Sequence, residues 1–180
     1  DLGRTPGGSA GGSSAALAAG YGPLSLGSDI GGSLRVPAFH CGVYAHKPTY
    51  GLVPSRGHTP PPFPPLPFDR DLAVIGPMAR CAADLSTLLD VMAGPDPLEA
   101  GKAYRLELPP PRHSTLKEFR VVVIDTDPVM PTDSVVRGSI GKLADNLGRT
   151  GVKIARHSEL LPDFAASTAL YMRMLMSFLA

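Results

Sequence analysis

The chain has 180 residues and a formal net charge of +1, with 43% hydrophobic and 18% charged residues. This length suits one domain or a large part of one, and the apolar content is too high for an intrinsically disordered chain. Because the charges nearly balance, we expect neither a nucleic-acid partner nor a membrane partner, and we leave a homo-oligomer open.

The first half of the chain alternates glycine-rich loops with short elements. In chain order the sequence predicts a loop over 1–12, an alanine-rich helix over 13–20, a brief strand or extended piece over 23–26, a second loop over 27–33, a segment over 34–41 that starts helically before Pro37, and a loop-rich stretch over 49–68.

The second half alternates strands and helices. The sequence predicts a strand over 72–77, an amphipathic helix over 81–93, a strand over 119–125, a helix over 132–147, a strand over 152–156 and a helix over 162–179. The apolar strand at 119–125 is typical of a sheet covered on both faces, and the next helix is expected to bury Val136, Ile140, Leu143 and Leu147. This alternation indicates an α/β fold. We expect an active-site segment over 1–95, a connecting loop over 96–118 and a strand-helix-strand-helix segment over 119–180.

Two loops rich in glycine and serine, 7–12 and 27–33, carry most of the chemical information. Such loops often only turn the chain. Loop amides before a helix also bind phosphate, but neither loop has the spacing of a P-loop or a dinucleotide-binding motif. Residues 7–11 match G-x-S-x-G, yet the residues before them cannot form the strand that an α/β-hydrolase elbow requires. An acyl-transfer site fits better, because it needs a hydroxyl beside backbone N–H donors that face the developing oxyanion.

The run GGSAGGSSAALAAGYGPLSLGSDIGGSLRVPAFHCGVYAHKPTYG, over 7–51, resembles the amidase signature family, whose members use a Ser–Ser–Lys triad. The resemblance implies a partial amidase-signature α/β core, with a large mixed twisted sheet surrounded by helices. It implies that Ser33 is the acylated nucleophile. It also implies that Ser9 is the bridging serine, with Gly8 supporting it through a cis Gly8–Ser9 peptide.

The same resemblance assigns roles to the residues around the nucleophile. It gives the oxyanion-hole N–H groups to Ile30, Gly31 and Gly32, and supporting hydrogen bonds to Asp29 and Arg35. The implied activity is hydrolysis of the carboxamide C–N bond of a small-molecule amide substrate by an acylamide amidohydrolase, with no cofactor and no metal.

The family's catalytic lysine lies upstream of the bridging serine, and this sequence has no lysine before Lys47. Lys47 belongs to the run His-Lys-Pro-Thr at 46–49, which matches a different stretch of the family, so its use as the base is a minor alternative. The chain also begins at Asp1 rather than at a methionine. We therefore expect a fragment without its upstream part, inactive alone, of a full-length protein that hydrolyses amides.

Two further alternatives stay open. The tract TPPPFPPLP over 59–67 favours polyproline II, which suits an interaction module built on a catalytically dead amidase fold. Phe63, Leu66 and Phe68 would instead line an apolar substrate entrance. A tRNA-linked amidotransferase subunit is the main variant inside the family, and the absence of a basic stripe argues mildly against it.

The histidines and cysteines show no metal-ligand spacing, so a metal site is not expected. His40 and Cys41 follow the proposed nucleophile closely, and we expect them to pack in the core. Cys41 and Cys81 are too few for a disulfide scaffold and favour a reducing, cytoplasmic location.

Overall fold

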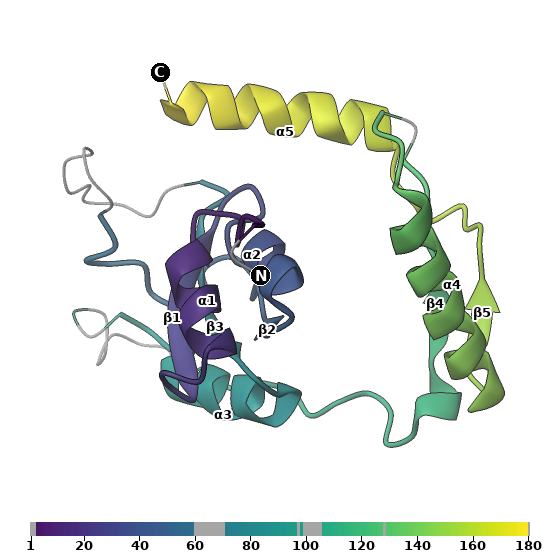
Figure 1. The fold of residues 1–180 in the computed structure, drawn as a ribbon, viewed down its shortest axis with the longest axis horizontal. Coiled ribbons are helices and arrows are strands. Elements are labelled where there is room, and N and C mark those ends of the chain that lie inside the picture. The colour runs from purple at the N-terminus through teal and green to yellow at the C-terminus, as the bar shows by residue number, and fades with distance from the viewer. Residues whose placement is uncertain (1–2, 60–70, 97, 99–105, 128, 180) are drawn as a thin grey trace. The chain divides into compact units, whose positions relative to one another are not determined.

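The computed structural model describes residues 3–59, 71–96, 98, 106–127 and 129–179, and the chain divides into two compact units, Asp1–Glu107 and Leu108–Ala180. Helices and strands occur in both units (Figure 1), which confirms the predicted α/β class. None of the helices in the described part combines the length and apolarity needed to cross a membrane.

The first unit is built on a three-stranded antiparallel sheet in the order β1-β3-β2. Its elements are α1 (Gly11–Ala18), β1 (Leu24–Asp29), α2 (Arg35–Cys41), β2 (Tyr44–Ala45), β3 (Val74–Ala79) and α3 (Ala82–Met92). The helix predicted at 81–93 is confirmed as α3. Instead of the one large sheet expected, the described strands form this sheet and a two-stranded one in the second unit.

One local prediction in this unit is wrong. Strand β1 continues through 27–29, which we expected to be loop, because these residues pair in register with residues 74–76 of β3. The helical start expected before Pro37 is confirmed as α2, which continues through this residue to Cys41. Pro37 lies in the first turn of the helix, where the backbone N–H groups have no intrahelical acceptor, so the missing N–H of proline removes no helical bond.

The core of the first unit joins α1, α2 and β3 through Leu17, Leu34, Ala38 and Met78. Leu34 is fully buried. Because it directly follows Ser33, its burial fixes the position of the proposed nucleophile against the sheet.

The second unit is a strand-helix-strand arrangement with a further helix. It contains η1 (Leu116–Glu118), β4 (Arg120–Val122), α4 (Ser134–Arg149), β5 (Lys153–Ala155) and α5 (Phe164–Leu179), and β4 pairs with β5 in parallel. Parallel strands need a crossover connection, which α4 supplies.

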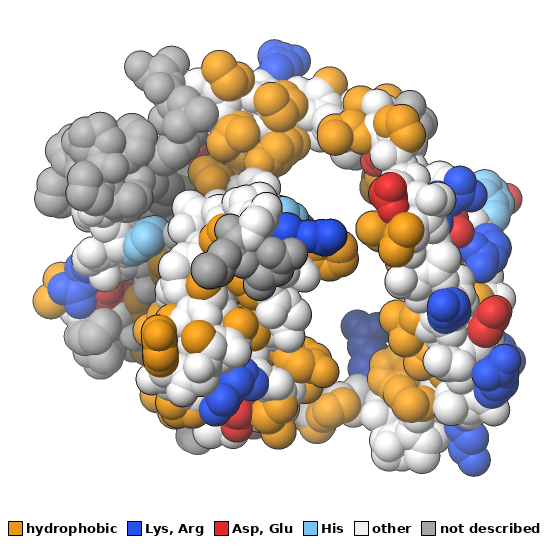
Figure 2. All heavy atoms as spheres, in the orientation of Figure 1, with side chains coloured by type: hydrophobic (Ala, Val, Ile, Leu, Met, Phe, Trp, Pro, Cys, Tyr) orange, Lys and Arg blue, Asp and Glu red, His pale blue; other side chains and the backbone are white. Residues whose placement is uncertain are grey.

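Burial in the second unit differs from two predictions. Leu143 is 60% exposed, and the buried position on α4 is Ala144. Ile124, expected inside a sheet covered on both faces, is 47% exposed. The reason is the small size of the sheet, since two short strands against α4 bury far less than a broad sheet. Figure 2 also shows hydrophobic side chains at the surface of α5, and Leu170 and Met176 of this helix are exposed.

Candidate functional site

The carboxylate of Asp29, at the end of β1, organises the loop that leads into α2. It is fully buried and accepts hydrogen bonds from the backbone N–H groups of Gly32 at 2.8 Å, Leu34 at 3.2 Å and Arg35 at 3.4 Å. The Arg35 guanidinium adds a fork, with Nε on Oδ2 and Nη2 on Oδ1, both at 3.0 Å. The two residues predicted to support the nucleophile therefore hold the whole turn around Ser33.

The charge on Asp29 is kept in spite of its burial. Burial by itself would raise the pKa of the carboxyl, because desolvation penalises the ionised form. Hydrogen bonds from the Arg35 side chain and from the N–H groups of Gly32 and Leu34 outweigh it and hold the pKa of Asp29 below its ordinary value of 3.8. The carboxylate is thus an acceptor at neutral pH, as its five donors require.

Glycine is required at position 32. Its φ is +110°, a region that side chains disfavour, and an added Cβ would lie 2.9 Å from Cγ2 of Val36. The N–H of Gly32, expected in the oxyanion hole, donates to Asp29 instead. Among the described residues, the N–H groups of Gly31 and Ser33 donate to no protein acceptor.

The structure brings the two serine loops together. The peptide between Gly8 and Ser9 is cis, as the resemblance implied. The next residue, Ala10, donates its N–H to the carbonyl oxygen of Ser33 at 3.1 Å. Ser9 is exposed and Ser33 is half-buried, so both hydroxyl-bearing residues lie at the surface of the unit on adjoining backbone.

His40 and Cys41 are not core residues. His40 is exposed and Cys41 is half-buried, at the last turn of α2. His40 Nδ1 lies 3.2 Å from the carbonyl oxygen of Thr5, and Cys41 Sγ donates to the carbonyl oxygen of Pro6 at 3.8 Å. The expectation of core packing is therefore wrong for His40, because its ring is used as a hydrogen-bonding group on the loop that leads to Ser9.

Lys47 is exposed and follows His46, whose backbone N–H donates to the carbonyl oxygen of Pro77 and so extends the pairing of β2 with β3. The polyproline tract falls outside the described residues except for its first residue, and so do the three apolar side chains proposed for a substrate entrance, Phe63, Leu66 and Phe68. In the described ranges, no three His, Cys, Asp or Glu side chains gather as metal ligands would.

An ion pair in the first unit had no signal in the sequence. Arg56 Nε lies 2.6 Å from Oδ2 of Asp96, and Arg56 Nη2 lies 2.6 Å from Oδ1. The hydrogen bond from Arg56 holds the pKa of Asp96 below its ordinary value. Together with the bond from Gly94 N–H to the Leu52 carbonyl oxygen at 3.1 Å, this pair joins the loop after residue 51 to the end of α3.

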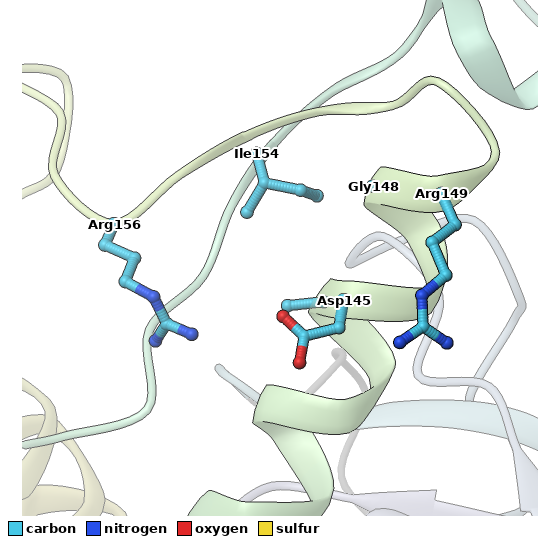
Figure 3. A pocket seen from close by; sticks show the side chains of 6 residues that line it. Asp145, Gly148, Arg149, Ile154 and Arg156 are labelled. Carbon is cyan, nitrogen blue, oxygen red and sulfur yellow. The ribbon is translucent and has the colours of Figure 1, made fainter.

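A hollow of about 540 Å³ lies in the second unit, lined by residues of α4 and the β5 region. Figure 3 shows Asp145 pointing into the space between Arg149 and Arg156. Arg156 also contacts Asp125, with Nη1 and Oδ2 2.7 Å apart. None of the residues proposed for the site lines this hollow.

Comparisons with known proteins agree with one another. A family model described as Amidase matches residues 1–180. The chain is 56% identical over 110 residues to a glutamyl-tRNA(Gln) amidotransferase subunit of Thermus thermophilus, over 61% of this chain and 21% of that protein. It is 50% identical over 101 residues to the AtzE subunit of 1-carboxybiuret hydrolase of Pseudomonas sp., over 56% of this chain and 21% of that protein.

Among solved structures, the corresponding glutamyl-tRNA(Gln) amidotransferase subunit of Thermotoga maritima superposes with a TM-score of 0.76 at 31% identity, over 98% of this chain and 37% of that one. The chain therefore spans between a fifth and two fifths of the length of these relatives.

Proposed function

Because the chain belongs to the amidase family, we propose that the whole protein breaks the C–N bond of a carboxamide through an acyl-enzyme on Ser33. The observation that carries this proposal is the contact of the two serine loops: Ala10, the residue after Ser9, donates its N–H to the carbonyl oxygen of Ser33. A hydroxyl nucleophile with a second hydroxyl beside it is the arrangement that a proton relay needs.

The proposed reaction has two halves. Ser33 Oγ attacks the amide carbonyl carbon while its proton passes through Ser9 to a base. Ser9 then returns the proton to the leaving nitrogen as the C–N bond breaks. An ester on Ser33 remains, and attack by water releases the carboxylic acid and restores both hydroxyls. The sequence has no lysine before Lys47, and we propose that the base is a lysine of the whole protein outside this chain.

The oxyanion of the tetrahedral intermediate needs N–H donors that are not already used. Gly32 does not supply one in this structure, since its N–H bonds to Asp29. We therefore centre the proposed oxyanion hole on the N–H groups of Gly31 and Ser33. Asp29 and Arg35 take no part in the chemistry and fix the turn that presents these donors.

The relatives favour an amidotransferase subunit over a free-standing amidase. Two of the three relatives described above are glutamyl-tRNA(Gln) amidotransferase subunits by name. The absence of a basic stripe is a weak objection, because this chain spans only 21% of the Thermus protein and the charge of the remainder is not in this sequence. We propose glutamine as the amide donor and further subunits as partners.

A hydrolase that acts on a small amide is the second candidate, favoured by the 50% identity to a 1-carboxybiuret hydrolase subunit. The general acylamide amidohydrolase activity predicted from the sequence falls under this candidate.

We also propose a reducing, cytoplasmic location for the protein. Both cysteines carry free thiols, which is consistent with that location.

The test measures ammonia release by the whole protein from glutamine, acetamide and biuret. Ser33→Ala and Ser9→Ala are each expected to lower turnover at least about 10³-fold, while Ser25→Ala, a serine within β1, serves as the matched control. Mass spectrometry of the acid-quenched reaction should find the acyl group on the Ser33 peptide. Substantial turnover by Ser33→Ala would refute the acyl-enzyme.

The same assay separates the two candidates. An amidotransferase subunit releases ammonia from glutamine, and the rate rises when its partner subunits and glutamyl-tRNA are added. A hydrolase of small amides prefers acetamide or biuret and does not respond to them. Turnover of none of these amides by the wild-type whole protein would favour the catalytically dead fold.

A further inference from the structure

We propose that α2 aligns both serines of the site, and that His40, at its last turn, is the residue that positions Ser9. This inference rests on the proposed function and adds a residue to which neither the sequence nor the resemblance gave a functional role. His40 acts through the loop that carries Ser9, so it is a positioning residue and not a catalytic one.

The first observation is a pair of side-chain hydrogen bonds from consecutive residues to consecutive carbonyls. His40 Nδ1 lies 3.2 Å from the Thr5 oxygen, and Cys41 Sγ lies 3.8 Å from the Pro6 oxygen. A carbonyl oxygen only accepts hydrogen bonds, so Nδ1 of His40 carries the proton. The thiol is a weak donor, and the imidazole therefore supplies most of this attachment.

The second observation is the close approach of Gly7 to the same helix. A Cβ at Gly7 would lie 3.2 Å from both Nδ1 of His40 and Cγ1 of Val36, and 3.3 Å from Cα of Pro37. The φ of Gly7 is +75°, and its N–H donates to Oγ1 of Thr5 at 3.1 Å. Segment 5–7 is thus a closed turn that packs directly against α2.

These contacts attach the loops of both serines to one short helix. Ser33 lies two residues before α2 begins at Arg35, and Ser9 lies two residues after Gly7. The hydrogen bond from the Ala10 N–H to the Ser33 carbonyl oxygen joins the two serine loops directly. Loss of the His40 bond would free the turn at 5–7 and let Ser9 move relative to Ser33.

A proton relay is sensitive to such movement. Hydroxyl-to-hydroxyl transfer needs heavy atoms about 2.6–3.2 Å apart, and a misplacement of about 1 Å costs up to about 10²-fold in rate. Substrate affinity does not depend on the relay, so the loss should appear in kcat with KM unchanged.

Three variants of His40 in the whole protein test this placement, with kcat, KM and Tm measured for each. The side-chain amide of Asn puts an N–H close to the Nδ1 position, whereas that of Gln reaches toward the Nε2 position and Leu has no donor. His40→Asn is expected to keep kcat within about threefold of wild type, while His40→Gln and His40→Leu lose about tenfold or more with KM within about twofold.

The pH profile of His40→Asn excludes a role for His40 in proton transfer. A positioning residue exchanges no proton with the substrate, and the side-chain amide of Asn keeps a donor for the Thr5 carbonyl. His40→Asn should therefore keep the wild-type pH profile. A profile that changes, or a kcat as low as that of His40→Leu, overturns the proposal.

Cys41 provides an independent variant. Cys41→Ser keeps a donor for the Pro6 carbonyl and should match wild type, and Cys41→Ala should lose about two- to threefold in kcat because the lost donor is weak. The proposal is also overturned if His40→Leu retains wild-type kcat while Ser33→Ala is inactive, since the proposed function then stands without it. Activity in Ser33→Ala would instead remove the proposed function itself.

Discussion

Gly27 and Gly76 lie directly opposite each other in the antiparallel pair of β1 and β3, and the side chain of Leu34 fills the space that their missing side chains leave. A Cβ on Gly27 would lie 2.8 Å from Cδ2 of Leu34, and one on Gly76 would lie 2.8 Å from Cδ1. Two glycines on neighbouring strands thus form the socket for the residue that follows Ser33.

We expect Gly76→Ala to be more destabilising than Gly27→Ala. A Cβ on Gly76 would clash with the carbonyl oxygen of His46, a backbone atom that cannot rotate away, whereas the Cβ on Gly27 meets the flexible end of Leu34. Overpacking of this kind costs about 1–3 kcal/mol, and we place Gly76→Ala at about 3 and Gly27→Ala at about 1 kcal/mol. The free energy of unfolding in urea measures both.

Gly12→Ala is the matched control for these glycine variants. Gly12 lies in α1, and a Cβ there meets no atom within 4 Å. Alanine in an exposed helix is favoured over glycine by about 0.5–1 kcal/mol, so this variant should stabilise the protein. Equal changes in the free energy of unfolding for Gly12→Ala and Gly76→Ala would contradict the claim that the space at Gly76 is needed for Leu34.

The glycines at 27 and 76 also show where sequence reasoning fails in this fold. Gly27-Ser28-Asp29 has the composition of a turn, and we expected a loop there. The long-range pairing with β3 makes it a strand, and a single sequence does not display pairing between segments about fifty residues apart. The helix at 81–93 was predictable because its apolar spacing is local.

Asp29→Asn should destabilise the protein by about 3 kcal/mol, because it leaves donors of the buried turn without their charged acceptor. The pKa of Asp29 is lowered in the folded state. A lowered pKa contributes stability that is present above the unfolded value of about 4 and is lost as pH falls through the folded pKa.

The difference in unfolding free energy between wild type and Asp29→Asn should accordingly be constant between about pH 5 and about pH 7, and should shrink as the pH falls below about 4. Urea titrations of both proteins at several pH values measure this difference. A difference that does not change toward acid pH would show that the charge of Asp29 is not what holds the turn.

Arg35→Met should raise the pH at which the stabilising contribution of Asp29 is fully lost. The guanidinium supplies two hydrogen bonds that lower the pKa of Asp29 against the effect of burial. Without it, burial is opposed by the backbone N–H groups alone and the pKa rises. Asp29 then contributes less stability, and the loss of this contribution is complete at a higher pH than in wild type, because the folded and unfolded pKa values lie closer together.

Arg35→Lys is the informative comparison for that variant. Lysine keeps the positive charge but not the planar fork that binds both carboxylate oxygens. We expect an acid transition between those of wild type and Arg35→Met. Because the Arg35 side chain is 57% exposed, the loss of stability at neutral pH should be small, about 1 kcal/mol or less. A transition for Arg35→Met identical to that of wild type would exclude Arg35 as a determinant of the Asp29 pKa.

The candidate site, like the fold, has parts that the sequence predicts and parts that it does not. The two glycine-rich loops and the resemblance to the amidase signature family were enough to choose Ser9, Ser33 and Asp29 as candidate residues. The direction of the Gly32 N–H could not, because it depends on φ at that residue and on the carboxylate of Asp29 three residues earlier. The bond from His40 to Thr5 joins residues 35 positions apart, and a histidine on a helix gives no sign of its partner.

Lys47 provides the last prediction, since it is the first lysine in the sequence and the minor alternative for the catalytic base. Its side chain is exposed, and its backbone neighbours extend the pairing of β2 with β3. We expect Lys47→Met in the whole protein to keep kcat for amide cleavage within about threefold of wild type, since it removes no group of the proposed relay.

The activity of the isolated 180-residue chain is a second test of Lys47 as the catalytic base. If Lys47 were the base, the chain would hold the complete triad with Ser9 and Ser33 and would release ammonia from an amide on its own. We expect it to be folded by circular dichroism and inactive. A loss of about 10³-fold or more in Lys47→Met, together with turnover by the isolated chain, would assign the base to Lys47. Proton transfer from Ser9 would then run within this chain instead of to a lysine outside it.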